Sequence, residues 1–216
     1  MEFPGTSRRA ARLIERIGRV APRSESSGGP ADQELVARVI GGEGAAFATI
    51  VERYQDRLHN TVLRLVGSAE DARDLVQDTF VKAYENLGGF RGGSSLYTWL
   101  FRIAVNTSLS HRRKKKWTRP LSAADDDDPP AAEGLADPHA ADPADPLMAA
   151  ETETLVQQAL GSLDEEHRTV IVLRDIEQCD YHQMAEILEV PAGTVKSRLH
   201  RARLMLRDKL KPLLKQ

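Results

Sequence analysis

The sequence predicts an all-α protein of two small helical domains joined by a flexible acidic linker. Apolar residues recur at spacings of three and four across most of residues 31–116 and 148–214, which is the period of an amphipathic helix. No segment alternates with a period of two, and no βαβ pattern occurs. Between the helical regions, residues 117–147 are rich in Asp and Pro and cannot bury a core. The chain therefore divides into two helical domains and a tether.

Glycines and caps order the helices of the first domain. An apolar stripe over residues 35–65 is interrupted by the glycines of 41–44 and ends at Gly67. Ser68 is placed to cap the next helix, with Asp71 at the third helical position in a weak capping box. That helix stops at the following glycine pair, before the loop FRGGSS. Further helices are predicted over residues 96–116, about 149–160, 164–174 (with Leu163 as a staple), 181–188 and from 194 onward.

The last two predicted helices have helix-turn-helix spacing. Val190–Pro191 makes the turn because proline cannot continue a helix, Gly193 permits a close approach, and Thr194 is expected to cap the second helix. The buried face of the first helix is expected to be Met184, Ile187 and Leu188. The apolar stripe of the second is expected to be Val195, Leu199, Ala202 and Leu206. Four basic residues lie largely off that stripe, namely Lys196, Arg198, Arg201 and Arg203.

Residues 1–30 form an N-terminal extension with two parts. Thr6 to Val20 could form a short amphipathic helix, and PRSESSGGP then reads as a flexible break. A disordered extension and a surface or partner helix both remain open. The apolar side of such a helix would be Leu13, Ile14, Ile17 and Val20, and the rest would carry Arg8, Arg9, Arg12, Arg16 and Arg19.

The charges are segregated along the chain, although the net charge is only -2. Seven Lys/Arg and no Asp/Glu occur from Phe101 to Pro120, and eight Asp/Glu and no Lys/Arg occur from Leu121 to Ala150. This pattern favours a polyanion partner for the basic parts. The single cysteine, Cys179, excludes an internal disulfide and fits a reducing cytoplasm, and no apolar run is long enough to span a bilayer.

Three surfaces are candidates for binding. The basic face of the last helix suits duplex DNA, because Arg can pair with guanine in the major groove; an ordinary solvated basic face is the alternative. The aromatic and basic helix over 96–116 suits single-stranded nucleic acid, although Trp99 and Phe101 also suit a core. Asn106 could bond a base edge or lie buried against backbone. The acidic, partly apolar helix AEDARDLVQDTF suits a protein partner or is merely solvated.

Two stretches together resemble a known family. EDARDLVQDTFVKAYENLGGFRGGSSLYTWLFRIAVNTSL and DYHQMAEILEVPAGTVKSRLHRAR are similar to regions 2 and 4 of group IV sigma factors of bacterial RNA polymerase. This is the extracytoplasmic-function (ECF) family, of the kind with an RpoE-like region 2. The resemblance covers roughly residues 31–212. It implies a transcription initiation factor in which region 2 would bind core polymerase and the melted -10 element, and region 4 the duplex -35 element.

The resemblance also implies partners and site residues. The partners would be the β′ clamp helices and β flap of core polymerase, promoter DNA and an anti-sigma factor, with no stable homo-oligomer. Core polymerase would be bound by Asp71, Asp74, Leu75, Gln77 and Asp78. The -10 element would be bound, with one base flipped, by Phe90, Arg91, Ser94, Tyr97, Trp99, Asn106, Arg112 and Arg113. The -35 element would be bound by Arg174, Tyr181, His182, Thr194, Lys196, Ser197, His200 and Arg201.

The chain departs from the family pattern at a few positions, and rival functions make different predictions. Gly93 stands where relatives often have Asp, Leu96 where they often have an aromatic, and Glu189 where they usually have Gly. A dimeric helix-turn-helix regulator would bind a palindrome tightly without polymerase. An enzyme is disfavoured because the one metal-like cluster, Asp125–Asp128, lies in a proline-flanked linker. We expect no cofactor and no metal.

Overall fold

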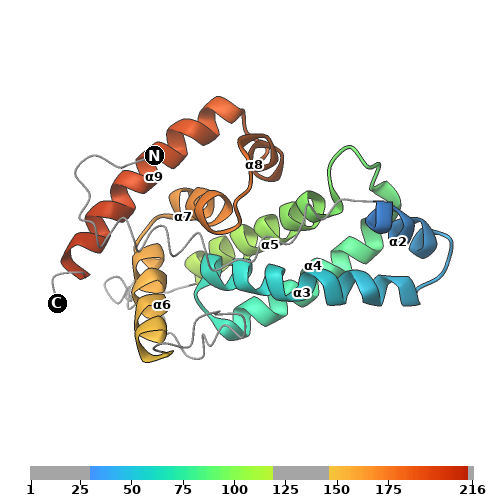
Figure 1. Cartoon of the computed structure of the whole chain (residues 1–216), viewed down its shortest axis with the longest axis horizontal. Coiled ribbons are helices and arrows are strands. Elements are labelled where there is room, and N and C mark those ends of the chain that lie inside the picture. Colours follow the sequence, from blue (N-terminus) through green and yellow to red (C-terminus); the bar gives the residue numbers. More distant parts are fainter. Residues whose placement is uncertain (1–29, 119–145, 214–216) are drawn as a thin grey trace. The chain divides into compact units, whose positions relative to one another are not determined.

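The computed structural model describes the backbone of residues 30–118 and 146–213, and the side chains of 31–115 and 154–211. Every regular element in these ranges is helical, as the sequence predicts, and they form two compact units (Figure 1). The predictions for the N-terminal extension and for most of the linker lie outside the described residues.

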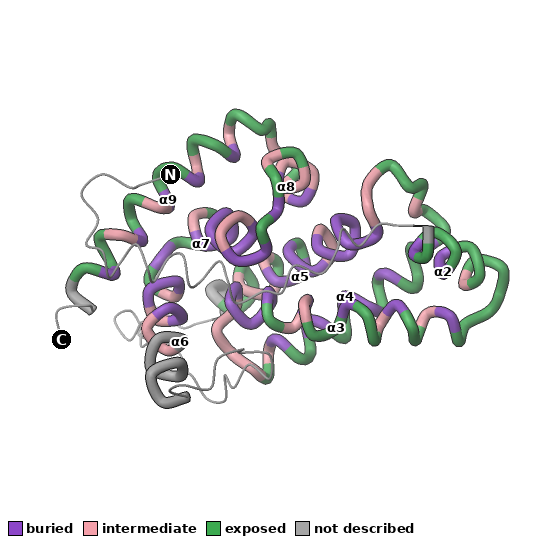
Figure 2. Tube along the Cα trace, viewed as in Figure 1, coloured by how far each residue is buried: buried purple, intermediate pink, exposed green. Residues whose placement is uncertain are grey.

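The first unit is built around one long helix. α3 packs against α2, α4 and α5. Its inner face is fully buried at Ile50, Leu58 and Val62, and α5, which packs against it, is fully buried at Leu100; both helices carry purple, buried stretches in Figure 2. The elements are α2 (Pro30–Ile40), α3 (Ala45–Val66), α4 (Ala69–Asn86), the 3-10 turn η1 (Leu87–Gly89) and α5 (Leu96–Thr118).

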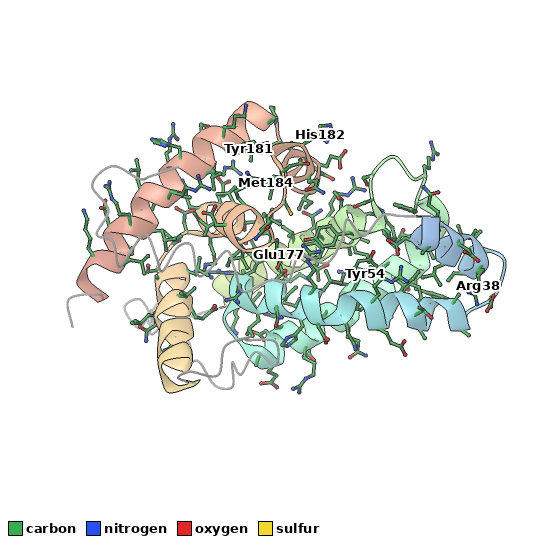
Figure 3. All side chains as sticks on the ribbon, viewed as in Figure 1. Arg38, Tyr54, Glu177, Tyr181, His182 and Met184 are labelled. Atoms are coloured by element: carbon green, nitrogen blue, oxygen red, sulfur yellow. The ribbon has the colours of Figure 1, made fainter. Side chains whose placement is uncertain are left out.

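Local signals place the helix ends of this unit well. Gly67 closes α3 in the left-handed conformation (φ 80°), with its N–H bonded to the Leu63 carbonyl. The Ser68 hydroxyl accepts the Asp71 N–H at 3.2 Å, which confirms the predicted cap of α4. A buried contact absent from the predictions joins α2 to α3: the Tyr54 hydroxyl donates to the Asp32 carboxylate at 2.6 Å, beside an Arg53 ion pair (Figure 3).

The second unit ends in the helix-turn-helix. Its elements are α6 (Pro146–Gly161), α7 (Glu165–Ile171), the π-helical segment η3 (Val172–Ile176), α8 (Tyr181–Leu188) and α9 (Ala192–Leu213). α9 packs against α6 and α7. The predicted stripe of α9 is buried at all four positions, and Met184 and Ile187 of α8 are fully buried. Leu188, which was expected to be buried, is half-buried.

Several predicted helix ends of this unit were wrong. α9 begins at Ala192, so Thr194 is not its cap: the Pro191 carbonyl accepts the N–H groups of Thr194 (2.9 Å) and Val195 (3.1 Å). Gly193 permits no special approach within the chain, because nothing lies within 4 Å of where its Cβ would be. The helix predicted to end at Arg174 changes to π-helical geometry at Val172, which no local sequence signal indicated. α6 also begins inside the predicted linker, at Pro146, and α5 of the first unit ends inside it, at Thr118.

The turn of the helix-turn-helix explains the departure at Glu189. Glu189 has φ 55°, in the left-handed region where a side chain is strained and glycine is not. It follows α8 in a Schellman arrangement, since the Val190 N–H bonds back to the Ala185 carbonyl at 3.2 Å. A family preference for glycine at this position is therefore a backbone preference.

Glu189→Gly is expected to stabilise the second unit. Relief of the strain at the left-handed φ should raise the free energy of unfolding by about 1 kcal/mol. The greater conformational entropy of glycine in the unfolded chain offsets a smaller part of this gain. Denaturant unfolding of the full chain measures this change. The matched control is Lys209→Gly in an exposed turn of α9, which should lower stability by about 1 kcal/mol. If both substitutions destabilise equally, the backbone argument is wrong.

Candidate nucleic-acid interface

The start of α9 presents a polar face to solvent. Val195 and Leu199 point into the core, and the intervening turns expose four of the residues assigned to duplex DNA. These are Lys196, Ser197, His200 and Arg201. The face lies at the N-terminal end of the second helix of the motif, which is the part that such motifs place in the major groove.

Two cations lie close to the ring of Tyr181: Lys196 of the exposed face and Arg174 of η3. The Arg174 guanidinium lies 5.0 Å and the Lys196 ammonium 5.4 Å from the centre of its ring, both within the range of cation–π attraction. Arg174 also donates to the Cys179 carbonyl at 2.6 Å, which holds it at the end of η3. His182 is exposed one residue further along α8 (Figure 3). The structure thus brings together residues that the sequence placed on three separate elements.

Two arginines of α9 are turned away from the exposed face. Arg198 pairs with Glu166 at 3.0 Å, and Arg203 forms a two-point ion pair with Asp175. Hydrogen bonding to Asp175 raises the pKa of Arg203 against the opposing effect of burial. The predicted four-residue basic surface is therefore corrected to Lys196 and Arg201. The other two cations hold α9 to the helices beneath it.

A groove runs between α4 and α5 of the first unit. It encloses about 490 Å³, and both of its walls are helical. Asn106 is exposed and lines it, so the alternative of a buried, backbone-bonded Asn106 is wrong. The other lining residues are Lys82, Asn86, Gly89, Trp99, Arg102, Ile103, Thr107 and Ser110. An exposed amide beside cationic side chains and an aromatic wall suits a nucleotide base and its phosphates.

The aromatic residues of α5 divide between groove and core. Trp99 is 9% exposed and lines the groove, with Phe90 at 5.4 Å between ring centres. Tyr97 is only 5% exposed and is stacked on Phe101 and under Arg57, whose guanidinium lies 3.9 Å from the ring centre. The assignment of Tyr97 to the -10 site is therefore corrected: its ring is packed on both sides and serves the core.

Sequence reasoning named only Trp99 and Asn106 among the lining residues of this groove and missed its two cations and its second amide. Lys82 and Asn86 lie one turn apart on α4, and Arg102 faces them from α5. The Lys82 ammonium donates to the Thr107 hydroxyl at 3.2 Å, which ties the two walls together. The i, i+4 spacing of Lys82 and Asn86 was visible in the sequence, but only the packing of α4 on α5 shows that this side faces Asn106.

The loop before α5 is shaped by its own hydroxyls. The Ser95 hydroxyl accepts the Thr98 N–H at 3.0 Å and so caps α5, while Gly92 adopts φ 70°. Arg91 is exposed and Ser94 is half-buried, so both predicted loop contacts are reachable from solvent.

The basic end of α5 is partly engaged in holding the fold. Arg112 donates to the Leu65 carbonyl at 2.8 Å, at the end of α3, and Arg113 is exposed. Lys115 bonds the Asp71 carboxylate at 2.8 Å, with His111 at 3.5 Å. Burial alone would raise the pKa of Asp71, but Lys115 and His111 together outweigh it and lower the pKa. Asp71 is thus an internal partner rather than a free surface carboxylate.

The acidic face of α4 is exposed at three of the five assigned positions. Asp74, Gln77 and Asp78 are exposed, whereas Leu75 is 4% exposed and packs in the core. The assignment of Leu75 to a partner surface is corrected for that reason. The remaining three residues form a polar strip that we call the α4 face.

Comparison with known proteins decides the family. Residues 50–118 match the model of sigma-70 region 2, and residues 153–206 match that of sigma-70 region 4. The chain belongs to the ECF group of sigma-70 family sigma factors. It is 38% identical over 188 residues to the RNA polymerase sigma-H factor of Pseudomonas aeruginosa, covering 86% of this chain and 96% of the relative. It is also 38% identical to the ECF RNA polymerase sigma-E factor of Haemophilus influenzae, covering 85% of this chain and 97% of the relative.

Solved structures agree with this sigma-factor assignment. One match is CnrH in complex with the cytosolic domain of CnrY, with a TM-score of 0.62, 28% identity and coverage of 85% of this chain and 99% of that one. Another is the sigma factor RpoE in complex with the anti-sigma factor NepR from Bartonella quintana, with a TM-score of 0.56, 29% identity and coverage of 76% and 96%. The α4–α5 groove lies within the residues that match sigma-70 region 2, and the exposed start of α9 lies within those that match region 4.

Two kinds of feature are absent from the described residues of this sigma factor. Within them, no helix combines the length and apolar character needed to cross a membrane. The same residues contain no group of three or more His, Cys, Asp or Glu side chains placed to hold a metal ion. The Asp125–Asp128 cluster lies outside the described residues.

Asp175→Ala is expected to loosen the recognition helix of the sigma factor. The Asp175 side chain is only 11% exposed, so its removal leaves the half-buried Arg203 without its two-point partner. A cost of about 1–2 kcal/mol is expected, between the values for exposed and fully buried pairs. Thermal unfolding of the full chain measures it, with Asp208→Ala, at an exposed pair on the same helix, as a control of small effect. Equal effects of the two substitutions would contradict a structural role for Asp175.

Proposed function

We propose that this chain directs core RNA polymerase to promoters by holding two DNA elements and the enzyme on three separate surfaces. The α4 face binds the polymerase, the α4–α5 groove takes the melted -10 element, and the exposed start of α9 reads the duplex -35 element. The chain itself has no catalytic role in this scheme, and it acts in the cytoplasm, where the polymerase works.

The observation that carries the -10 assignment is the exposure of Asn106 within the α4–α5 groove. A mediocre helix former on an apolar helix is exposed beside Lys82 and Arg102, which can neutralise phosphates. Because the Asn106 side chain is exposed, an unstacked base of a single strand can reach its amide. Trp99 provides an aromatic wall for it, and Phe90 packs against the Trp99 ring.

The -35 assignment is supported by the separation of the cations of α9 into two groups. Arg201 and Lys196 remain exposed on one face, while Arg198 pairs with the exposed Glu166 and Arg203 with the largely buried Asp175. A face limited to a few side chains can discriminate bases, because each bidentate pair contributes about 1–3 kcal/mol. Thr194 lies half-buried in the first turn of α9 and remains a candidate contact to phosphate.

Regulation by an anti-sigma factor is part of the proposal. The sigma factor RpoE, a structural match to this chain, was solved in complex with the anti-sigma factor NepR. We infer that a comparable inhibitor covers the α4 face or the DNA surfaces here. The dimeric helix-turn-helix regulator gains no support from the structure, because it leaves the matching residues 50–118 without a role.

Co-purification from the native host tests the proposal. The tagged full chain should bring down the core polymerase subunits and, before induction, one additional small protein. Association with DNA fragments alone, without polymerase subunits, would favour the dimeric regulator instead.

A further inference from the structure

A second groove, distinct from the α4–α5 groove, lies between α3 and α4. It encloses about 510 Å³ and is lined mainly by Phe47, Val51, Val76, Phe80, Val81 and Tyr84. Val81 is 51% and Tyr84 53% exposed, and both belong to the small set of large exposed apolar residues of the described chain. Phe47 lies edge-on to Phe80 and Tyr84, with 6.3 and 5.0 Å between the ring centres, so three aromatic rings pack together in the lining of the groove. We call this the α3–α4 groove.

One side of the α3–α4 groove is acidic. Helical geometry places Asp74, Asp78 and Glu85 on the same side of the lining stripe of α4, and Glu85 itself lines the groove. Asp74 and Asp78 are exposed. The basic residue Arg73 lies at the opposite end. An occupant of this groove therefore needs a narrow apolar stripe with positive charges beside it.

The N-terminal extension of this chain has that composition. Over Thr6 to Val20, four aliphatic residues fall on one helical side, and five arginines accompany a single acid, Glu15. A helix of that length would extend about 22 Å, close to the roughly 20 Å over which α4 lines the groove. We infer that residues 6–20 dock in the α3–α4 groove of the same chain as an amphipathic helix.

The connection to the fold is long enough for this docking. α2 begins at Pro30, and Asp32 contacts Arg53 and Tyr54 of α3. The α3 wall of the groove includes Val51 and Gln55, which lie at the same level along that helix. The intervening residues 21–29 can extend to about 30 Å, whereas a helix is about 10–12 Å across. The tether therefore has only to pass around one helix.

Docking of residues 6–20 would restrain the function proposed above. Gln77 both lines the α3–α4 groove and belongs to the α4 face. A helix seated there covers the polymerase-binding side, and its arginines neutralise Asp74 and Asp78. This consequence rests on the proposed function, whereas the docking itself does not. The extension then acts as an internal competitor that core polymerase must displace.

Thiol protection in the full chain tests the docking directly. Val81→Cys places a reactive thiol in the groove, while the native Cys179 is only 1% exposed and stays silent. Maleimide modification at position 81 should be about tenfold slower in the Val81→Cys chain than in a chain that also carries Leu13→Asp and Ile17→Asp. This ratio corresponds to docking of residues 6–20 in about nine-tenths of the molecules. Asn60→Cys, exposed on the other side of α3, is the control and should react equally in both backgrounds.

The outcomes separate the possibilities. Equal modification of Val81→Cys with and without the two Asp substitutions overturns the proposal. Protection that grows with protein concentration also overturns it, since the extension would then dock on a second copy. Protection that is independent of concentration supports it, and core polymerase should then bind the Leu13→Asp, Ile17→Asp chain up to about tenfold more tightly. Protection without that gain supports docking but shows that the polymerase face is misassigned.

Discussion

Charge reversal of Asp74 and Asp78 to lysine is expected to abolish association with core RNA polymerase. Both carboxylates are exposed on the α4 face, so reversing their charge should disturb the interface with polymerase rather than the packing of the fold. A loss of at least about 100-fold in affinity is expected, equivalent to about 2.8 kcal/mol. Titration of core polymerase with labelled full-length protein measures it.

A matched variant separates the α4 face from general charge. Glu52 and Asp56 are exposed and spaced one turn apart on α3, as Asp74 and Asp78 are on α4. Their reversal changes the net charge equally and should leave most of the affinity intact. Circular dichroism should show unchanged helix content in both variants. Unchanged affinity of the α4 variant for core polymerase would mean that this face is misassigned.

Arg201→Ala and Asn106→Ala are expected to impair different promoter elements. Arg201 is exposed on the start of α9 and can bridge a guanine edge, so its loss should cost about 1–3 kcal/mol of -35 binding and relax preference at one position. Asn106 lies in the α4–α5 groove, so its loss should leave duplex -35 binding alone and impair capture of the melted -10 element.

Open-complex formation by the holoenzyme tests this division of labour. Promoters are varied at the -35 and -10 elements separately, and each variant is compared with wild type. Lys209→Ala is the control for Arg201→Ala, because it removes an exposed cation further along α9. A shift in preference at the same element by both substitutions would show that the two units do not read separate sites. A single-site DNA-binding protein would then be the better description.

Much of the local structure followed from the sequence. The cap at Ser68, the glycine that ends α3 and the buried stripe of α9 all depend on residues within one or two turns of each other. The exposure of Lys196 and Arg201 follows from the same helical period. The π-helical segment over Val172–Ile176 left no such signal, because the residues from Val170 to Leu173 are all apolar and all buried, so no helical period can be read there.

The sequence by itself determined which helices form, where most of them end and which chemistry each face carries. The tertiary structure alone decided which of those charged and aromatic groups are free. Arg198 and Arg203 look like Arg201 in the sequence, yet Glu166 and Asp175 on other elements bind them. Tyr97 and Leu75 were likewise assigned to binding but lie in the core. Helical periodicity is a local property, whereas an ion pair or a buried ring depends on neighbours that only packing brings into contact.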